Sequence, residues 1–162
     1  MSIKTNLRVL KRTRANPAPG DVFAMLLPDE DYLFGRVILA DLPSSRAPMP
    51  TANLVYIYDV RETAKSPPLD LLKPQRLLIA PQFINRMPWS KGYFENVALR
   101  PLQESDVLQQ HCFWDPLRKV FRDEAGEVVG RRTEPCGVWG LGSYRMIDDL
   151  ISDALGIKRV PE

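Results

Sequence analysis

Residues 21–40 read DVFAMLLPDEDYLFGRVILA, and the order of these side chains predicts a β-hairpin. Two apolar runs of strand length flank the tetrapeptide PDED, whose residue types favour turns and disfavour strands. In the second run, alternate positions form a wholly apolar face and an amphipathic one. The apolar face carries Leu33, Gly35, Val37 and Leu39, and the amphipathic face carries Tyr32, Phe34, Arg36 and Ile38. We expect the apolar face to lie against a core, and Gly35 to mark a bend or a close approach of two backbones.

Shorter strand patterns follow the hairpin along the chain. Residues 53–60 alternate, with Leu54, Tyr56, Tyr58 and Val60 on one face and Val55 and Ile57 on the other. Residues 76–80 and 93–99 are also expected to be strands. Within residues 117–129 a second hairpin is expected, because Gly126 can supply the positive φ of its loop.

The clearest helix is expected near the C-terminus. Ser143 suits its N-cap, and Gly156 suits the position just after its last turn. Between them an apolar stripe repeats at helical spacing, formed by Tyr144, Ile147, Leu150, Ile151, Ala154 and Leu155. Strands followed by one helix predict an α+β fold, with a curved or barrel-like (SH3-like) antiparallel β-sheet and a C-terminal α-helix packed on it.

Length and composition are those of one ordinary globular domain. The 162 residues can bury a core without a disulfide or a metal, and 44% are hydrophobic and 26% charged. The net charge of +2 conceals an asymmetry, because five of the 22 basic residues precede residue 15 with no acid among them. Removing these five leaves 17 basic and 20 acidic residues, a net charge of −3. We therefore expect a basic N-terminal arm over residues 1–16 and a single α+β domain over residues 17–162.

No pattern in the sequence indicates a membrane, a metal or a cofactor. No window holds the roughly 18 apolar residues of a spanning helix, and charges interrupt the apolar residues near the N-terminus, unlike those of a secretory signal. We expect a cytoplasmic protein in which Cys112 and Cys136 remain thiols. One histidine and two cysteines cannot complete a four-ligand zinc site without carboxylates.

His111 and Cys112 come closest to a catalytic pair. Neighbouring residues of a strand point to opposite faces, and nothing in the spacing brings Cys136 to His111. The glycine-rich stretch GVWGLGSY at 137–144 lacks both the lysine and the βαβ unit of a phosphate-binding loop. We therefore predict a protein that is not an enzyme.

Candidate partner-binding residues lie in the hairpin and in an aromatic loop. The acidic turn could hold a cation or oppose a basic partner, although a solvated hairpin tip is the simpler explanation. Tryptophans are more often core than contact residues, and Trp89, which follows Pro88 in a loop, is the best candidate among them for an exposed one. The predicted partner-binding set is Asp29, Glu30, Asp31, Tyr32, Arg36 and Trp89.

The segment GDVFAMLLPDEDYLFGRVILAD at 20–41 resembles the opening signature of immunity protein 26, a family of bacterial polymorphic-toxin systems. Gly20, Asp21, Phe23, Gly35 and Arg36 fit that signature, but the turn departs from it because no glycine appears there. The stretch VYIYDV at 55–60, the segment 81–89 and the ending at 137–156 are also similar in order and spacing. The resemblance covers most of residues 17–156 and leaves the basic arm outside.

This resemblance implies an inhibitor that binds and neutralises one cognate toxin domain, with no catalytic residues and with contacts that vary with the toxin. The hairpin also resembles the opening of the SH3-like ribonuclease toxins of toxin–antitoxin pairs. An SH3-like barrel that binds or cleaves RNA therefore remains the alternative, favoured by Arg36 and the basic arm. A nucleic-acid partner is disfavoured because the body is net negative, whereas phosphate binding needs clustered cations.

Overall fold

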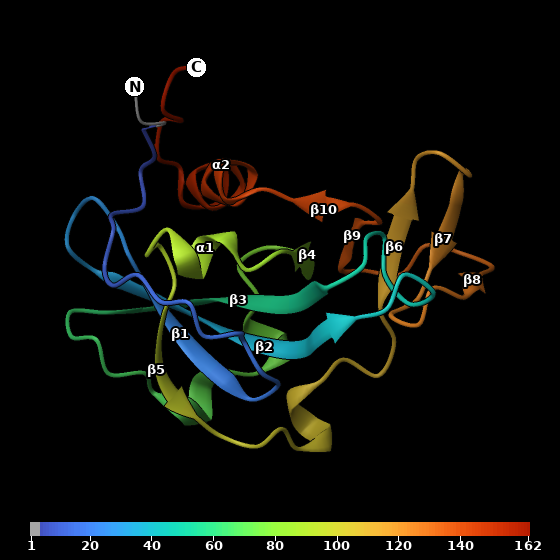
Figure 1. The fold of residues 1–162 in the computed structure, drawn as a ribbon, viewed down its shortest axis with the longest axis horizontal. Helices are drawn as coiled ribbons and strands as arrows, with labels where there is room; N and C mark the ends of the chain where they lie inside the picture. Colours follow the sequence, from blue (N-terminus) through green and yellow to red (C-terminus); the bar gives the residue numbers. More distant parts are fainter. Residues whose placement is uncertain (1–3) are drawn as a thin grey trace.

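A six-stranded sheet runs through the computed structural model, which describes residues 4–162 (Figure 1). Its strands lie in the order β10-β4-β3-β2-β1-β5, and all neighbours are antiparallel except β10 and β4. The strands are β1 (Asp21–Leu26), β2 (Tyr32–Leu42), β3 (Ala52–Glu62), β4 (Gln82–Ile84), β5 (Glu95–Leu99) and β10 (Leu141–Gly142). The expected α+β fold with a curved sheet is confirmed, but the sheet is not a closed barrel, because β10 and β5 remain separate edges.

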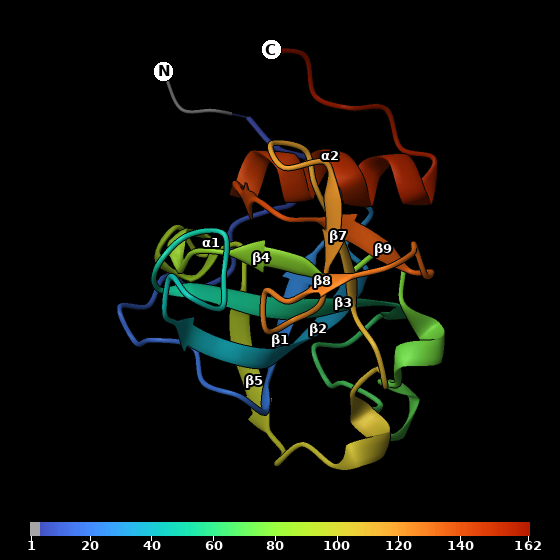
Figure 2. The ribbon, with the colours of Figure 1, turned by 90° about the vertical axis from the view of Figure 1, so that its right-hand side faces the viewer.

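A smaller four-stranded sheet lies at one end of the molecule (Figures 1 and 2). Its order is β8-β7-β6-β9, with β6 and β9 parallel. The strands are β6 (Cys112–Asp115), β7 (Val120–Arg122), β8 (Val128–Val129) and β9 (Cys136–Val138). Gly126 has φ 82° in the connection from β7 to β8, which confirms the second predicted hairpin.

Two helices cover one face of the larger sheet, α1 (Met87–Ser90) and α2 (Tyr144–Leu155) (Figure 1). The hydroxyl of Ser143 accepts a hydrogen bond from the Met146 amide, and Gly156 ends α2 in the left-handed conformation at φ 71°. The predicted helix and both of its ends are therefore confirmed. Ile147 and Ile151 bury its apolar stripe against the sheet.

The opposite face is covered by long connections that contain three short 3-10 turns, η1 (Leu69–Leu71), η2 (Pro74–Arg76) and η3 (Glu104–Asp106). The larger sheet is therefore buried on both faces. The alternation predicted for residues 53–60 is confirmed, since the side chains of β3 divide between two hydrophobic clusters. Leu54, Tyr56, Tyr58 and Val60 face the connections, and Val55 and Ile57 face the helices.

Gly35 lies where β2 packs most tightly against its surroundings. A Cβ atom at this position would lie 2.3 Å from Cζ of Phe23 and 2.7 Å from the carbonyl oxygen of Tyr56. The close approach predicted from the sequence is confirmed, because only a residue without a side chain fits between these atoms.

Two segments differ from what the sequence pattern indicates. Residues 76–80 form only the isolated bridge between Leu77 and Tyr58 rather than a strand. Pro74 and Pro81 bracket this run, and proline cannot donate to a strand ladder. The N-terminal segment, of which residues 4–17 are described, also lacks regular structure, but it is anchored: Leu7 is buried, and its amide and that of Asn6 donate to the Asp148 carboxylate on α2.

Candidate functional site

The acidic turn predicted as a binding site projects from the β1–β2 hairpin. Its charge is partly compensated, because the Arg61 guanidinium on β3 pairs with Asp29 and, at 3.4 Å, with Asp31. Glu30 adopts a left-handed φ of 71° at the tip, where its side chain is exposed. Asp29, Glu30 and Asp31 thus lie together at the surface, next to the half-buried Tyr32.

Trp89 and Arg36 lie inside the molecule, apart from the acidic turn. The prediction that Trp89 is exposed is wrong: its side chain is fully buried, since the short helix α1 folds its loop back onto the sheet. Its ring packs edge-on against Phe23 and Phe94, and its Nε1 donates to Asn96. Arg36 is 1% exposed on β2. Neither side chain reaches the molecular surface, so the six predicted residues do not form one surface patch.

Arg36 anchors a buried ion network that the sequence pattern does not reveal. Its Nη1 lies 3.3 Å from a carboxylate oxygen of Asp106, and its Nη2 donates to the carbonyl of Arg100 at 2.7 Å. The other carboxylate oxygen accepts from Lys73 at 2.6 Å, and the Gln103 amide donates to the first at 2.8 Å. A lone arginine in an apolar strand indicates a buried carboxylate partner. Nothing in the sequence says that this partner follows 70 positions later, in η3.

The pKa of Asp106 reflects this network. Burial alone would raise the pKa of the carboxyl. The hydrogen bonds from Lys73 and from the Gln103 amide, together with the charge of Arg36, outweigh burial and hold the pKa below its usual range. The carboxylate is therefore ionised in the folded protein, and it holds two connections, through Lys73 and through η3, against the sheet.

A second polar network joins the buried Tyr56 and His111 to the partly exposed Glu124. The Leu108 amide donates to the Tyr56 hydroxyl at 3.1 Å, and that oxygen lies 2.5 Å from Nε2 of His111. Either group can donate in this hydrogen bond, because the hydroxyl gives its proton to an unprotonated Nε2 or accepts one from a protonated Nε2, according to the tautomer of the imidazole. Nδ1 faces the Glu124 carboxylate at 3.4 Å, a long distance for a hydrogen bond. Burial lowers the pKa of His111 more than Glu124 raises it, and burial raises the pKa of Tyr56 to about 12.

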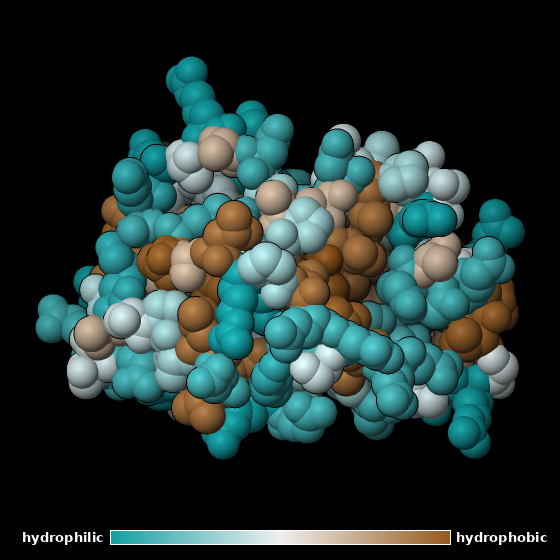
Figure 3. All heavy atoms as spheres, turned by 90° about the horizontal axis from the view of Figure 1, so that it is seen from below, coloured by the Kyte–Doolittle hydropathy of each residue, from teal (hydrophilic) through white to brown (hydrophobic). Residues whose placement is uncertain are grey.

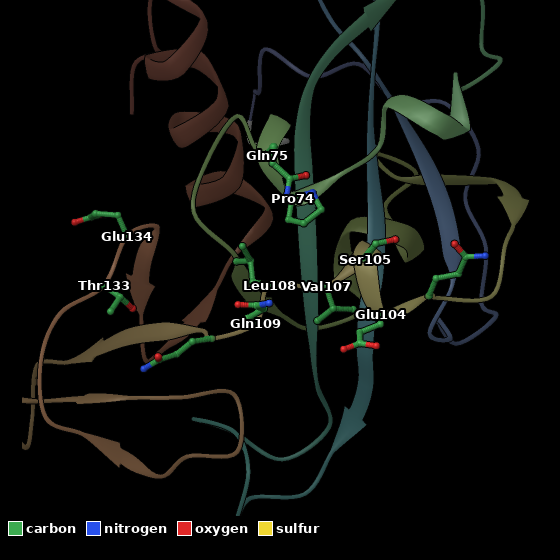
Figure 4. Close-up of a pocket in the computed structure, with 11 residues that line it drawn as sticks. Pro74, Gln75, Glu104, Ser105, Val107, Leu108, Gln109, Thr133 and Glu134 are labelled. Atoms are coloured by element: carbon green, nitrogen blue, oxygen red, sulfur yellow. The ribbon is translucent and has the colours of Figure 1, made fainter.

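Both networks adjoin a groove of about 890 Å³, because Gln103 and Leu108, whose amides donate to Asp106 and to Tyr56, line it (Figure 4). Three chain segments line it: Pro74 and Gln75, residues 103–105 with 107–110, and Thr133 with Glu134. Four of the lining residues are glutamines, at positions 75, 103, 109 and 110. Figure 3 shows the molecule from below Figure 1, where hydrophobic groups gather near the middle of the face and hydrophilic side chains surround them. The groove is a polar surface feature whose walls are fixed by buried charges.

The two thiols lie together, but among residues 4–162 no hydrogen bond joins either of them to His111. Cys112 and Cys136 are paired in register between β6 and β9, and their sulfur atoms lie 3.2 Å apart. Burial and the neighbouring Cys112 thiol raise the pKa of Cys136 to about 11. A thiol with such a pKa is almost entirely protonated near neutral pH and is a poor nucleophile.

Cys136 should therefore react slowly with iodoacetamide in the native protein. A rise of about two pKa units lowers the thiolate fraction near pH 7 roughly 100-fold, so alkylation should be slower by about that factor than in urea-unfolded protein. Mass spectrometry of peptides sampled over time measures the rate, and a Cys112→Ala variant shows whether the neighbouring thiol contributes. Labelling of native Cys136 at the unfolded rate would contradict this assignment.

The stability of the protein should fall on acidification because of His111. Its folded pKa is below the unfolded value of about 6.5, so the unfolded chain binds the extra proton. The contribution to stability is complete above about pH 6.5 and is lost as pH falls below that value. Urea denaturation between about pH 7.5 and 5 should show this loss, and a His111→Gln variant should flatten the slope. If the dependence of stability on pH were unchanged in the His111→Gln variant, the assignment of this loss to His111 would be wrong.

Comparison with protein families identifies the chain. The model described as "Immunity protein 26" matches residues 18–123, about two thirds of the sequence. The chain belongs to the immunity protein 26 family. Neither a curated protein nor a solved structure gives a significant match. Membership of this family implies an immunity function, in which the protein neutralises a toxin.

The segment matched by the immunity protein 26 model carries most of the site. It extends from just before β1 through β7 and includes Arg36, Lys73, Asp106 and His111. The N-terminal segment and helix α2 lie outside it. Among residues 4–162, no helix is long and apolar enough to cross a membrane, and no cluster of three or more histidine, cysteine or acidic side chains could hold a metal ion.

Proposed function

We propose that the protein binds one cognate toxin domain and blocks it by covering its surface, without transforming a substrate itself. Family membership carries this proposal. The structure supports it through a surface whose connections are held in place by the buried Arg36–Asp106–Lys73 network. A rigid surface loses little conformational entropy on binding, which favours tight association.

The alternative function in RNA binding loses one of its two supports. That support is Arg36, the cation on the amphipathic face of the hairpin. It is buried and paired with Asp106, so it cannot reach a phosphate without breaking an internal ion pair. The acidic turn remains a candidate for contact with the toxin, with Glu30 as its exposed and unpaired carboxylate within the described part of the chain.

Co-expression tests the proposed function. The toxin domain encoded immediately upstream should arrest growth by itself, and the protein should restore growth and co-elute with that domain on gel filtration. An unrelated toxin domain serves as the control and should not be neutralised. Continued arrest together with separate elution of the two proteins would overturn the proposal.

A further inference from the structure

The N-terminal segment and helix α1 form one continuous positively charged surface. Three backbone hydrogen bonds place the segment: the Arg8 amide donates to Leu26, the Leu10 amide to Gly92, and the Thr13 amide to Trp89. The last two bonds place residues 10–13 beside α1 and the turn that follows it, while Leu7 packs in the cluster on the helical side of the larger sheet and Leu10 in the cluster on its other side. Its cations and those around α1 are called the basic face here, and they are Arg8, Lys11, Arg12, Arg14, Arg86 and Lys91.

The charges of the basic face are available to a partner. All six side chains are exposed, and none forms an ion pair with an acid among residues 4–162. Arg86 donates to the carbonyl of Arg14 and to the side chain of Asn16, both of which are uncharged. Six like charges on one surface repel one another, which an acidic partner would relieve.

The basic face also exposes apolar side chains. Val9 is 50% exposed and Met87 is 40% exposed, and both adjoin the cations in sequence or in space. Exposed apolar groups next to charged ones are typical of protein–protein interfaces. Single-stranded nucleic acid instead needs aromatic platforms on which bases stack, and residues 8–14 contain no aromatic residue.

The surface is also preorganised. Asp148 on α2 accepts hydrogen bonds from the amides of Asn6 and Leu7, and the Asn6 side chain donates to Ser152 and to the carbonyl of Lys158. The segment is thus fixed before any partner arrives, which lowers the entropic cost of association. Residues 8–14 precede the segment that the family model matches, as suits a contact that selects one toxin rather than one common to the family.

From these observations we propose that the basic face docks an acidic surface of the toxin. This inference rests on the proposed function and adds the partner's chemistry and the surface that recognises it. Charge complementarity of this kind accelerates encounter and selects between partners.

Charge reversal tests the proposal through the association rate. The test variant combines Lys11→Glu, Arg12→Glu and Arg14→Glu. The matched control combines Arg46→Glu, Arg118→Glu and Lys119→Glu, which change the net charge equally on exposed loops beyond the described ion pairs. Binding of each to the upstream-encoded toxin domain is measured by surface plasmon resonance at about 0.05 M and about 0.5 M salt. Thermal unfolding first shows that both variants are folded.

The test variant should associate at least ~10-fold more slowly at low salt, and the control should change the rate by less than about twofold. High salt should lower the association rate of the wild-type protein and bring it toward that of the test variant. Equal, salt-independent rates for all three proteins would overturn the inference and leave the proposed function standing. Absence of any wild-type binding would overturn both.

Binding of a single-stranded RNA probe distinguishes a nucleic-acid partner from the proposed acidic protein partner. The proposal predicts no binding to this probe at about 0.15 M salt. Binding that is abolished in the test variant and retained in the control would assign the basic face to nucleic acid and overturn the inference.

Discussion

Replacing Asp106 by asparagine should lower the free energy of unfolding by about 3–5 kcal/mol. The side chain is 4% exposed and pairs with both Arg36 and Lys73, so asparagine keeps the shape but removes the charge. Arg36 would then be a buried cation without a counterion, and an uncompensated buried charge is the costly outcome of breaking such a pair. Urea denaturation at neutral pH, with a fixed slope against denaturant, measures the loss.

Two further variants make this prediction specific. In Arg36→Met/Asp106→Leu both charges are removed together, and this pair should recover much of the loss, because a buried ion pair is roughly neutral against apolar residues of similar size. Glu134→Gln removes a carboxylate from the exposed Arg132 pair and should change stability little. A loss below about 1 kcal/mol in Asp106→Asn would contradict the network's role.

Replacing Gly35 by valine should be the second severe change, with a loss of about 3 kcal/mol or more. Even the Cβ atom would overlap the Phe23 ring and the Tyr56 carbonyl, and neither can move freely. Phe23 stacks on Phe94 with ring centres 4.3 Å apart and lies against Trp89, and the Tyr56 carbonyl belongs to the backbone of β3. Thermal unfolding followed by circular dichroism measures the loss.

A second substitution identifies the cause of the Gly35 effect. Phe23→Leu shortens the side chain that would meet the new Cβ, so Gly35→Ala should be less harmful in that background than in the wild type. Gly130→Ala is the matched control, because no atom lies within 4 Å of its added Cβ, and it should leave stability nearly unchanged. Equal losses for Gly35→Ala in both backgrounds would contradict the steric explanation.

Local chemistry predicted the elements that depend on neighbouring residues. The hairpin around residues 28–31, the alternation of β3, the need for a small residue at position 35 and both ends of α2 were all readable from the sequence, because turns, strand faces and caps are short-range features.

The features that the sequence pattern did not predict depend on contacts between residues far apart in the chain. Arg36 was expected on an amphipathic face, but that face is covered by connections that bring Asp106 to it. Trp89 looked exposed because its neighbours are those of a loop, and only the packing of α1 buries it. The basic face likewise arises from two segments about 75 positions apart, whose cations are brought together by two backbone hydrogen bonds, from Leu10 to Gly92 and from Thr13 to Trp89. A single sequence does not specify such contacts.

The central claim is that the protein neutralises a toxin by occupying it, and a titration of toxin activity tests this most directly. A fixed amount of the upstream-encoded toxin domain is mixed with increasing protein, and its residual activity is measured after short and long incubation. Stoichiometric binding predicts that activity falls in proportion to added protein, reaches zero at a fixed molar ratio and does not depend on incubation time. Complete, time-dependent loss of toxin activity at a small fraction of that ratio would contradict the account, because it would mean that each molecule of the protein inactivates many toxin molecules.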